Sequence, residues 1–299
     1  MQIEAHIIRA FAHNNKGGNP AGVVLDADSL SKEDKQAIAA KMAMSETAFV
    51  SRSSVADFKL EFFTPSRQIP HCGHATIATF SYLKQIGRVD SSHSSKETID
   101  GIRSIYFKND EAYMEQGNPK YHIPADDLAS ILTSLHLSNK ELVDGLEPTI
   151  VNTGNSFLLI PLKDEEVLHS LAVNLQEVSR LSEKYGLIGF YPFTTNVKDT
   201  GFDATTRMFG PYYGIAEEAA TGMAAGPLAC FLHQKGLVKT NINIQQGKFT
   251  AEPSPSLLNV ILNLENGDIK NLYAGGKAYY ESRRTVEYNG ITHVKFQYY

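Results

Sequence analysis

The chain has 299 residues, of which 42% are hydrophobic and 20% charged, and its formal net charge at pH 7 is −5. This composition excludes a disordered chain and a collagen-like repeat, and mild acidity without a Lys/Arg stripe argues against a nucleic-acid partner. The two cysteines, Cys72 and Cys230, are too few for a disulfide framework and indicate a reducing compartment. Without a long apolar run or a signal-peptide pattern, we expect a cytoplasmic protein that does not bind membranes.

Helices and strands alternate along the chain. In the first half the patterns predict strands at 3–11, 21–25, 47–50 and 58–63, and a capped helix from Ser31 to Met44. In the second half they predict a helix at 125–137, a strand at 156–162 and a helix from Asn174. A break rich in proline and glycine at 116–124 separates two predicted domains, 1–120 and 121–283, and the segment from about 284 to 299 is expected to pack back on the first.

A faint internal repeat relates the two halves. The first half holds Gly18-Asn19-Pro20, then Phe63-Thr64-Pro65 and the segment 72–83, and the second half holds 154–156, 209–211 and 221–232 in the same order. Both final segments are apolar around the whole helical circumference, which is typical of a buried helix. The predicted fold class is therefore α+β, with two pseudo-symmetric domains that each wrap a mixed β-sheet around a central buried helix.

Both buried helices are predicted to begin at a glycine, Gly73 and Gly222. If the halves are related by a pseudo-twofold axis, the two helix starts face one interdomain cleft. Their free N–H groups and positive dipole ends would then bind a carboxylate or another small anion. The alternative is that each glycine only begins a tightly packed helix.

Glu46 is the leading candidate for a catalytic residue. It falls at the C-terminal end of the helix predicted from Ser31, where the helix dipole disfavours an acid, and its neighbours are apolar. Both influences oppose ionisation of its carboxyl group, and a carboxylate that readily takes up a proton suits a general base for carbon deprotonation. The alternative is an ordinary solvent-facing glutamate at a helix–strand turn.

Possible metal ligands and proton carriers cluster around the first helix start, at His71, Cys72 and His74. No second Cys/His cluster completes a zinc site, so a metal is not expected. Cys72 could act as a nucleophile or proton carrier, and His74 could relay a proton or be structural. Glu217 and Glu218 either complement the second helix start, or one of them holds a substrate amine or shares a proton, and spacing does not decide which.

Six short motifs then occur in order from residue 18 to about residue 232. They are Gly18-Asn19-Pro20-Ala21-Gly22, Ser45-Glu46-Thr47-Ala48-Phe49, Phe63-Thr64-Pro65, Cys72-Gly73-His74-Ala75-Thr76, Arg207-Met208-Phe209-Gly210-Pro211 and the segment 214–222. As a set they resemble the PhzF (phenazine biosynthesis-like) family. The resemblance implies the diaminopimelate epimerase fold with the site between the halves, and it also implies a homodimer.

The resemblance implies roles for individual residues. The family's glutamate base falls on Glu46, and the phenazine enzyme uses it to move a proton between ring carbons of trans-2,3-dihydro-3-hydroxyanthranilate without cofactor or metal. The implied catalytic residues are thus Glu46, His74 and Glu218, and the implied substrate-binding residues are Ser45, Cys72, Gly73, Thr221, Gly222 and Met223.

Three departures from the family pattern indicate an altered pocket. Glu218 replaces the usual aspartate, Ala219 replaces the usual proline, and Met223 stands where a small polar residue is commoner. We therefore expect a ligand other than the phenazine precursor. The two cysteines of diaminopimelate epimerase correspond to Cys72 and Thr221, so a two-thiol racemase is disfavoured.

The sequence as a whole predicts a cofactor-independent isomerase that moves a proton between carbons of a small carboxylate-bearing, amino-acid-like metabolite. Two alternatives stay open. One is a non-catalytic small-molecule-binding protein on the same scaffold, and the other is a thiol-dependent epimerase that uses Cys72.

Overall fold

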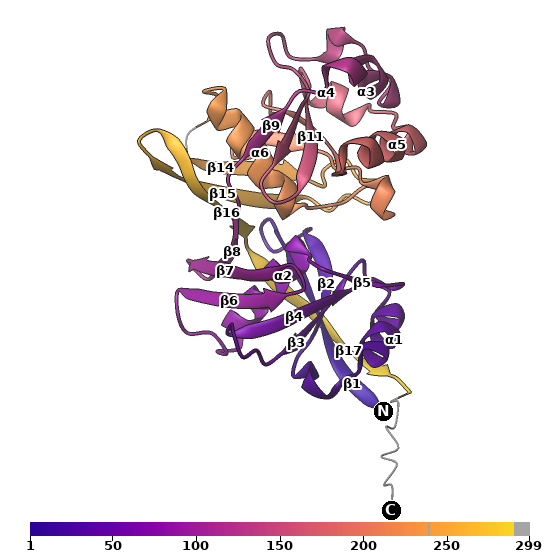
Figure 1. The fold of residues 1–299 in the computed structure, drawn as a ribbon, viewed down its shortest axis with the longest axis vertical. Coiled ribbons are helices and arrows are strands. Elements are labelled where there is room, and N and C mark those ends of the chain that lie inside the picture. The colour runs from indigo at the N-terminus through magenta and orange to yellow at the C-terminus, as the bar shows by residue number, and fades with distance from the viewer. Residues whose placement is uncertain (239, 290–299) are drawn as a thin grey trace, which may run out of the picture.

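The computed structural model describes residues 1–238 and 240–289, which form two stacked halves. In Figure 1 the N-terminal half, in indigo and purple, lies below the second half, in magenta to orange. The first half contains α1 (Lys32–Met42), α2 (Gly73–Gln85), β1 (Gln2–Ala10), β2 (Asn19–Val24), β3 (Thr47–Ser51), β4 (Phe58–Phe63), β5 (Gln68–Ile69), β6 (His93–Thr98), β7 (Gly101–Lys108), β8 (Glu111–Gln116) and the late strand β17 (Ala278–Glu287).

The second half has the same kind of composition. It contains α3 (Leu128–Ser134), α4 (Glu165–His169), α5 (Leu175–Tyr185), α6 (Gly222–Gln234), β9 (Lys120–His122), β10 (Thr149–Asn152), β11 (Ser156–Pro161), β12 (Leu187–Thr194), β13 (Ala204–Thr206), β14 (Asn241–Gln246), β15 (Ser256–Glu265) and β16 (Asp268–Gly276). Short 3-10 helices lie at Ala27–Ser29, Ala125–Asp127, Asn139–Glu141 and Pro211–Tyr213.

The strand pairing repeats between the halves. The first ladder runs β17–β1–β2–β3–β4–β6–β7–β8, and only the β2–β3 and β4–β6 pairs are parallel. The second runs β9–β10–β11–β12–β13–β14–β15–β16, and only β11–β12 and β13–β14 are parallel. Parallel strands need a crossover, and helices supply it at equivalent places, with α2 before β6 and α6 before β14. The predicted fold class is confirmed.

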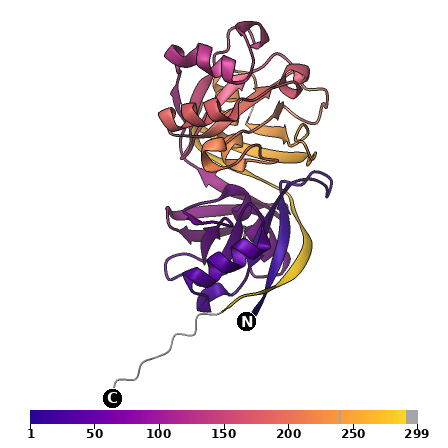
Figure 2. The ribbon, with the colours of Figure 1, turned by 90° about the vertical axis from the view of Figure 1, so that its right-hand side faces the viewer.

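The chain passes between the halves twice, after β8 and after β16, and these two strands pair with each other. Strand β17 then runs back along β1, beside which it lies in Figures 1 and 2. The pairing begins at Ala278, six residues before the predicted start of the returning segment at 284. Residues 290–299 of that segment lie outside the described residues, and the domain bounds stay a prediction.

Helices α2 and α6 fill the centres of the two halves. All α2 residues from Gly73 to Leu83 are buried, and so are the α6 residues from Ala224 to Leu232. A helix that is apolar on every side can only be stable when protein surrounds it, which explains why each sheet curls around one. Across the described ranges, every helix is too short or too polar to serve as a membrane span.

Two predicted helices differ from the observed ones. The Ser31 and Asp34 capping box is present, but α1 ends at Met42, where Ala43 turns the chain left-handed with a φ of 52°. The prediction of a helix through Met44 was therefore wrong, because the following residues are drawn into β3 between β2 and β4. The predicted helix at 125–137 begins as a 3-10 turn, and only Leu128–Ser134 is α-helical.

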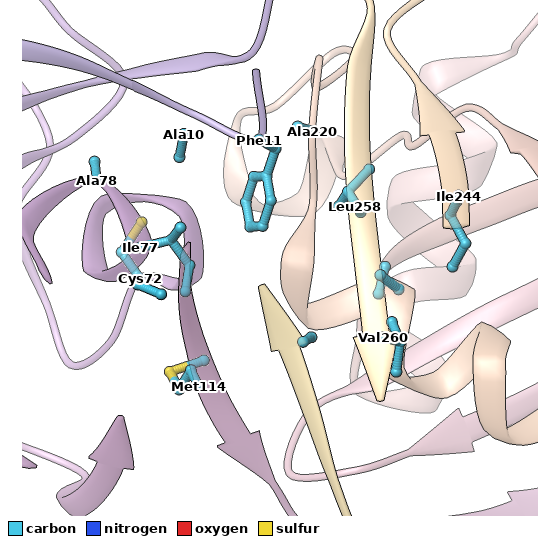
Figure 3. Packing of buried hydrophobic residues seen from close by; sticks show 14 of the residues in the cluster. Ala10, Phe11, Cys72, Ile77, Ala78, Met114, Ala220, Ile244, Leu258 and Val260 are labelled. Atoms are coloured by element: carbon cyan, nitrogen blue, oxygen red, sulfur yellow. The ribbon is translucent and has the colours of Figure 1, made fainter. Parts of the chain in front are cut away.

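Phe11 joins the two halves. Its backbone has a left-handed φ of 61° at the end of β1, and its side chain is fully buried. Figure 3 shows the ring between Ala10 and Ala78 of the first half and Ala220 and Leu258 of the second. A Cβ at Gly222 would lie 2.6 Å from the ring carbon Cζ, so only glycine fits at the start of α6.

Candidate active site

Glu46 lies in the connection between α1 and β3, directly before Thr47. Because α1 ends at Met42, the prediction that Glu46 belongs to its C-terminal end was wrong. The residue is nevertheless buried, with 8% of its surface exposed. Its carbonyl oxygen accepts a hydrogen bond of 3.0 Å from the backbone N–H of Gly22, which ties Glu46 to β2.

His74 connects the candidate catalytic residues. Its Nε2 lies 3.2 Å from Oε2 of Glu46, and its Nδ1 lies 3.4 Å from Oε1 of Glu218. The imidazole therefore bridges two carboxylates that are 172 residues apart in the chain. Although they are close, His74 Nε2 and Glu46 Oε2 are not aligned as a hydrogen bond, and neither atom has another partner among the described residues. Both remain free to exchange a proton with a ligand.

The electrostatics favour an imidazolium at His74. Burial opposes its protonation, but the contacts with the Cys72 sulfur, Glu46 and Glu218 outweigh burial, and the pKa of His74 lies well above its ordinary value. Burial raises the pKa of the Cys72 thiol, whose sulfur lies 3.5 Å from His74 Nδ1. The raised pKa of Cys72 favours its thiol form, and contacts with Glu46 and Glu218 also raise the pKa of His74.

Hydrogen bonds hold Glu218 in place. Its Oε1 accepts from the amide Nδ2 of Asn19 at 3.0 Å, and its Oε2 accepts from the Thr221 hydroxyl. The amide of Gln246 donates to the Glu218 carbonyl at 2.7 Å and to the Thr221 hydroxyl at 3.1 Å. Since Asn19 belongs to the first half, these bonds also join the two sides of the site.

The two helix starts face each other, as the repeat predicts. A Cβ at Gly73 would lie 2.9 Å from Cγ of Met223 and 3.7 Å from its backbone nitrogen. The residues that precede the helices, Cys72 and Thr221, make no side-chain capping hydrogen bond within the described structure. N–H donors of both first turns can therefore point at a shared ligand.

Of the remaining predicted residues, Ser45 is exposed next to Glu46, and its hydroxyl makes no hydrogen bond within residues 1–238 and 240–289. Thr221 is 6% exposed and donates to Glu218. Met223 is half-buried, and its side chain covers Gly73. The structure thus brings all the predicted residues to the site except for the side chain of Ser45.

A metal could be considered at Glu46, Cys72 and His74, because one donor atom from each lies within 4.8 Å of the others. Metal binding needs a neutral imidazole and a thiolate. Here the proton is held on His74 and burial keeps Cys72 a thiol, so a cation would have to displace both protons. The donor set is suited to moving protons.

Comparison with known proteins identifies the family. The model of the family described as phenazine biosynthesis-like protein (PhzC-PhzF) matches residues 8–284. The chain belongs to the phenazine biosynthesis-like family. The uncharacterized isomerase YddE of Escherichia coli K12 is 32% identical over 254 residues, which cover 83% of this chain and 85% of that one.

A second relative has a substrate in its name. Trans-2,3-dihydro-3-hydroxyanthranilate isomerase of Pseudomonas chlororaphis is 31% identical over 258 residues, covering 83% of this chain and 87% of the relative. The crystal structure of a PhzF-family phenazine biosynthesis protein of Bacillus anthracis covers 96% of this chain and 100% of its own, with 26% identity and a TM-score of 0.86. The predicted family is confirmed, and so is the prediction that the chain is an isomerase.

Sequence reasoning missed two residues that hold Glu218 in place, Asn19 and Gln246. In the sequence Asn19 stands only as part of a motif, whereas in the structure its amide donates to both Glu218 and the carbonyl of Ala220. Its place in a Gly-Asn-Pro turn that recurs as Gly154-Asn155-Ser156 was the available signal. Gln246 carries no such signal, because it is one polar residue at the end of a strand.

Replacement of Cys72 tests the thiol mechanism. We expect Cys72→Ser to change the rate of deuterium incorporation from heavy water into a substrate carbon by less than about tenfold. The buried thiol is uncharged, and serine keeps the size of the side chain and is a good N-cap. If the substitution abolished incorporation while the protein stayed folded, the thiol-dependent epimerase would be the better assignment.

Proposed function

We propose that the chain is a cofactor-independent isomerase that moves a proton between carbons of a small carboxylate-bearing, amino-acid-like metabolite. Its activity would be similar to that of its relative trans-2,3-dihydro-3-hydroxyanthranilate isomerase. The observation that carries the proposal is the imidazole of His74 between the carboxylates of Glu46 and Glu218. We further propose that the protein is cytoplasmic and forms a homodimer. Light scattering after gel filtration would test the dimer.

In the proposed reaction the carboxylate of Glu46 takes a proton from a substrate carbon. The electron pair of the broken C–H bond moves into the adjacent unsaturated system. The proton on Glu46 exchanges with solvent, and Glu46 then returns a proton to another carbon, so the reaction is an isomerisation without a co-reactant. The protonated His74 lies beside Glu46 and stabilises negative charge as it develops. Glu218 keeps His74 protonated through the contact with its other ring nitrogen.

The substrate carboxylate would lie at the two helix starts. The first-turn N–H groups near Gly73 and Gly222 are donors in fixed positions. Because Met223 already covers Gly73, the space there is narrower than with a small residue. This supports a ligand that differs from the phenazine precursor.

Deuterium labelling tests the proposal. The protein is incubated in heavy water with trans-2,3-dihydro-3-hydroxyanthranilate and with a panel of small amino acids and unsaturated carboxylic acids. We expect at least one compound to gain carbon-bound deuterium, as seen by mass spectrometry and NMR. A compound that raises the melting temperature but gains no deuterium would instead favour the non-catalytic binding protein.

A further inference from the structure

Asn19 reaches from the first half into the second beside the candidate active site. It is the first residue of β2 and is 5% exposed. Its amide Nδ2 donates to Oε1 of Glu218 and to the carbonyl oxygen of Ala220, both at 3.0 Å. Its backbone is fixed as well, because it pairs with Ala10 of β1. A side chain of the first half is thus held against the segment that leads into α6.

The two carboxylate oxygens of Glu218 have different partners. Oε2 accepts from the hydroxyl of Thr221, three residues further along the same segment. Oε1 accepts from Asn19, and among the described residues its only other hydrogen-bond or ion-pair partner is Nδ1 of His74, at 3.4 Å. Both partners of Oε1 therefore belong to the first half, and Asn19 is the one that donates a short hydrogen bond.

Gln246 cannot replace Asn19 in this role. Its Nε2 donates to the carbonyl oxygen of Glu218 and to the hydroxyl of Thr221, and its Oε1 accepts from the hydroxyl of Tyr191 and the backbone N–H of Thr221. A side-chain amide has two N–H donors, so none is left for the carboxylate. Without Asn19, the carboxylate of Glu218 could turn about its bond to Thr221 and carry Oε1 away from His74.

The place of Oε1 matters for the charge of His74. The titratable groups that face the ring are Cys72 from the start of α2, Glu46 from the connection before β3, and Glu218 from the segment before α6. Burial opposes protonation of the imidazole, so the pKa of His74 stays high only while these neighbours are in place. Because Coulomb attraction falls with distance, a carboxylate that turned away would hold the ring proton less strongly.

We propose that Asn19 is a positioning residue for proton transfer, which keeps Oε1 of Glu218 against Nδ1 of His74 and so keeps the imidazole protonated. It acts through Glu218. The proposal rests on the proposed function in one respect, which is that the protonated His74 stabilises negative charge on the substrate. The alternative is that Asn19 only adds an ordinary hydrogen bond between the halves.

Nitrogen-15 NMR of the histidine rings tests the proposal without a substrate. The ring nitrogens of His74, assigned through His74→Gln, are followed in the full-length protein between about pH 5 and 10. Asn19→Leu keeps nearly the size of the side chain but has no donor. We expect it to lower the titration midpoint of His74 by about one pH unit, a tenfold loss of proton affinity. Asn19→Ser, whose hydroxyl is too short to reach Glu218, should do the same. An unchanged titration would overturn the proposal.

A double-mutant cycle shows whether Asn19 acts through Glu218. Glu218→Gln alone should lower the midpoint of His74 at least as much as Asn19→Leu does, because it removes the charge itself. Asn19→Leu added to Glu218→Gln should then lower the midpoint no further. If the two shifts add, Asn19 affects His74 by another route and the proposal fails.

Gln116 provides a matched control. Like Asn19 it is a buried amide of the first half, at 7% exposure, with two hydrogen bonds to the second half. It donates to the carbonyl oxygen of Gly222 at 2.9 Å and accepts from the hydroxyl of Thr153 at 2.7 Å. Gln116→Leu should leave the titration of His74 unchanged even if it lowers the melting temperature. If it lowers the midpoint as Asn19→Leu does, the shift follows from weaker docking of the halves and the proposal is wrong.

The catalytic consequence is measured by carbon labelling in heavy water over the same pH range. Asn19→Leu should slow labelling by about tenfold at neutral pH. The loss should grow as the pH rises, because His74 of the variant gives up its proton before that of the wild type. A loss that is the same at every pH would mark a merely structural role and contradict the proposal.

The two proposals can fail separately, because the titration of His74 needs no substrate. A shift in Asn19→Leu, with a wild-type protein that labels no carbon, would refute the isomerase and leave the positioning role of Asn19 standing. Labelling by the wild type without a shift in Asn19→Leu would refute the positioning role alone.

Discussion

Glu46→Gln is expected to slow deuterium incorporation into the substrate by about 10³-fold, within the range that a general acid–base group contributes. Glutamine has nearly the shape of glutamate, so the buried site at 8% exposure stays filled. What it lacks is the oxygen that accepts the carbon proton, which faces Nε2 of His74 at 3.2 Å. The measurement is the rate of carbon labelling in heavy water, together with the melting temperature.

Glu61→Gln is the control for this prediction. Glu61 lies on the neighbouring strand β4, its side chain is also largely buried, and it pairs with Lys35 away from the site. The control should label substrate at the wild-type rate even if it is less stable. Should Glu46→Gln label at a similar rate, Glu46 would not be the base, and the assignment built on the His74 bridge would have to be abandoned.

Lys96→Met is expected to stabilise the protein at pH 7 by about 2–4 kcal/mol. Burial lowers the pKa of Lys96 from its ordinary 10.5 to about 7, which corresponds to about 5 kcal/mol of lost stability. Methionine fills the same space without a charge. Part of the gain is offset by the lost hydrogen bonds to His71 and Thr76, at about 1 kcal/mol each.

The stability gained by Lys96→Met should depend on pH. Between pH 7 and 10.5 the unfolded chain holds a proton on Lys96 that the folded chain releases, so this lysine destabilises the wild type progressively as the pH falls. The advantage of Lys96→Met is thus full at pH 7 and nearly gone above pH 10. Urea unfolding at pH 7 and 9.5 measures it, and a pH-independent difference would contradict the burial argument.

Lys35→Met should have the opposite effect. Lys35 is also buried, at 6% exposure, but it pairs with Glu61, so its removal leaves a buried carboxylate without its partner. We expect this variant to lose stability by about 3 kcal/mol at pH 7. Comparing the two lysines separates an uncompensated buried charge from a compensated one.

Local features of the fold could be predicted from the sequence alone. The Ser31 and Asp34 capping box depends on two residues three positions apart, and glycines at the head of apolar segments mark the starts of α2 and α6. The repeated order of motifs also predicted two related halves, because the same order of strands and helices folds into the same ladder. The predicted end of α1 was wrong because the pairing of β3 with β2 is a tertiary contact, which local sequence does not show.

The site depended on tertiary packing. Residue types and motifs singled out Glu46, His74 and Glu218, yet only the docking of one half on the other brings both carboxylates to opposite nitrogens of one imidazole. Lys96 could have been suspected as an inward-facing lysine in an alternating strand, but its contact with His71 joins residues 25 apart. Such contacts are set by the shape of the two packed sheets, and no local pattern in the chain records that shape.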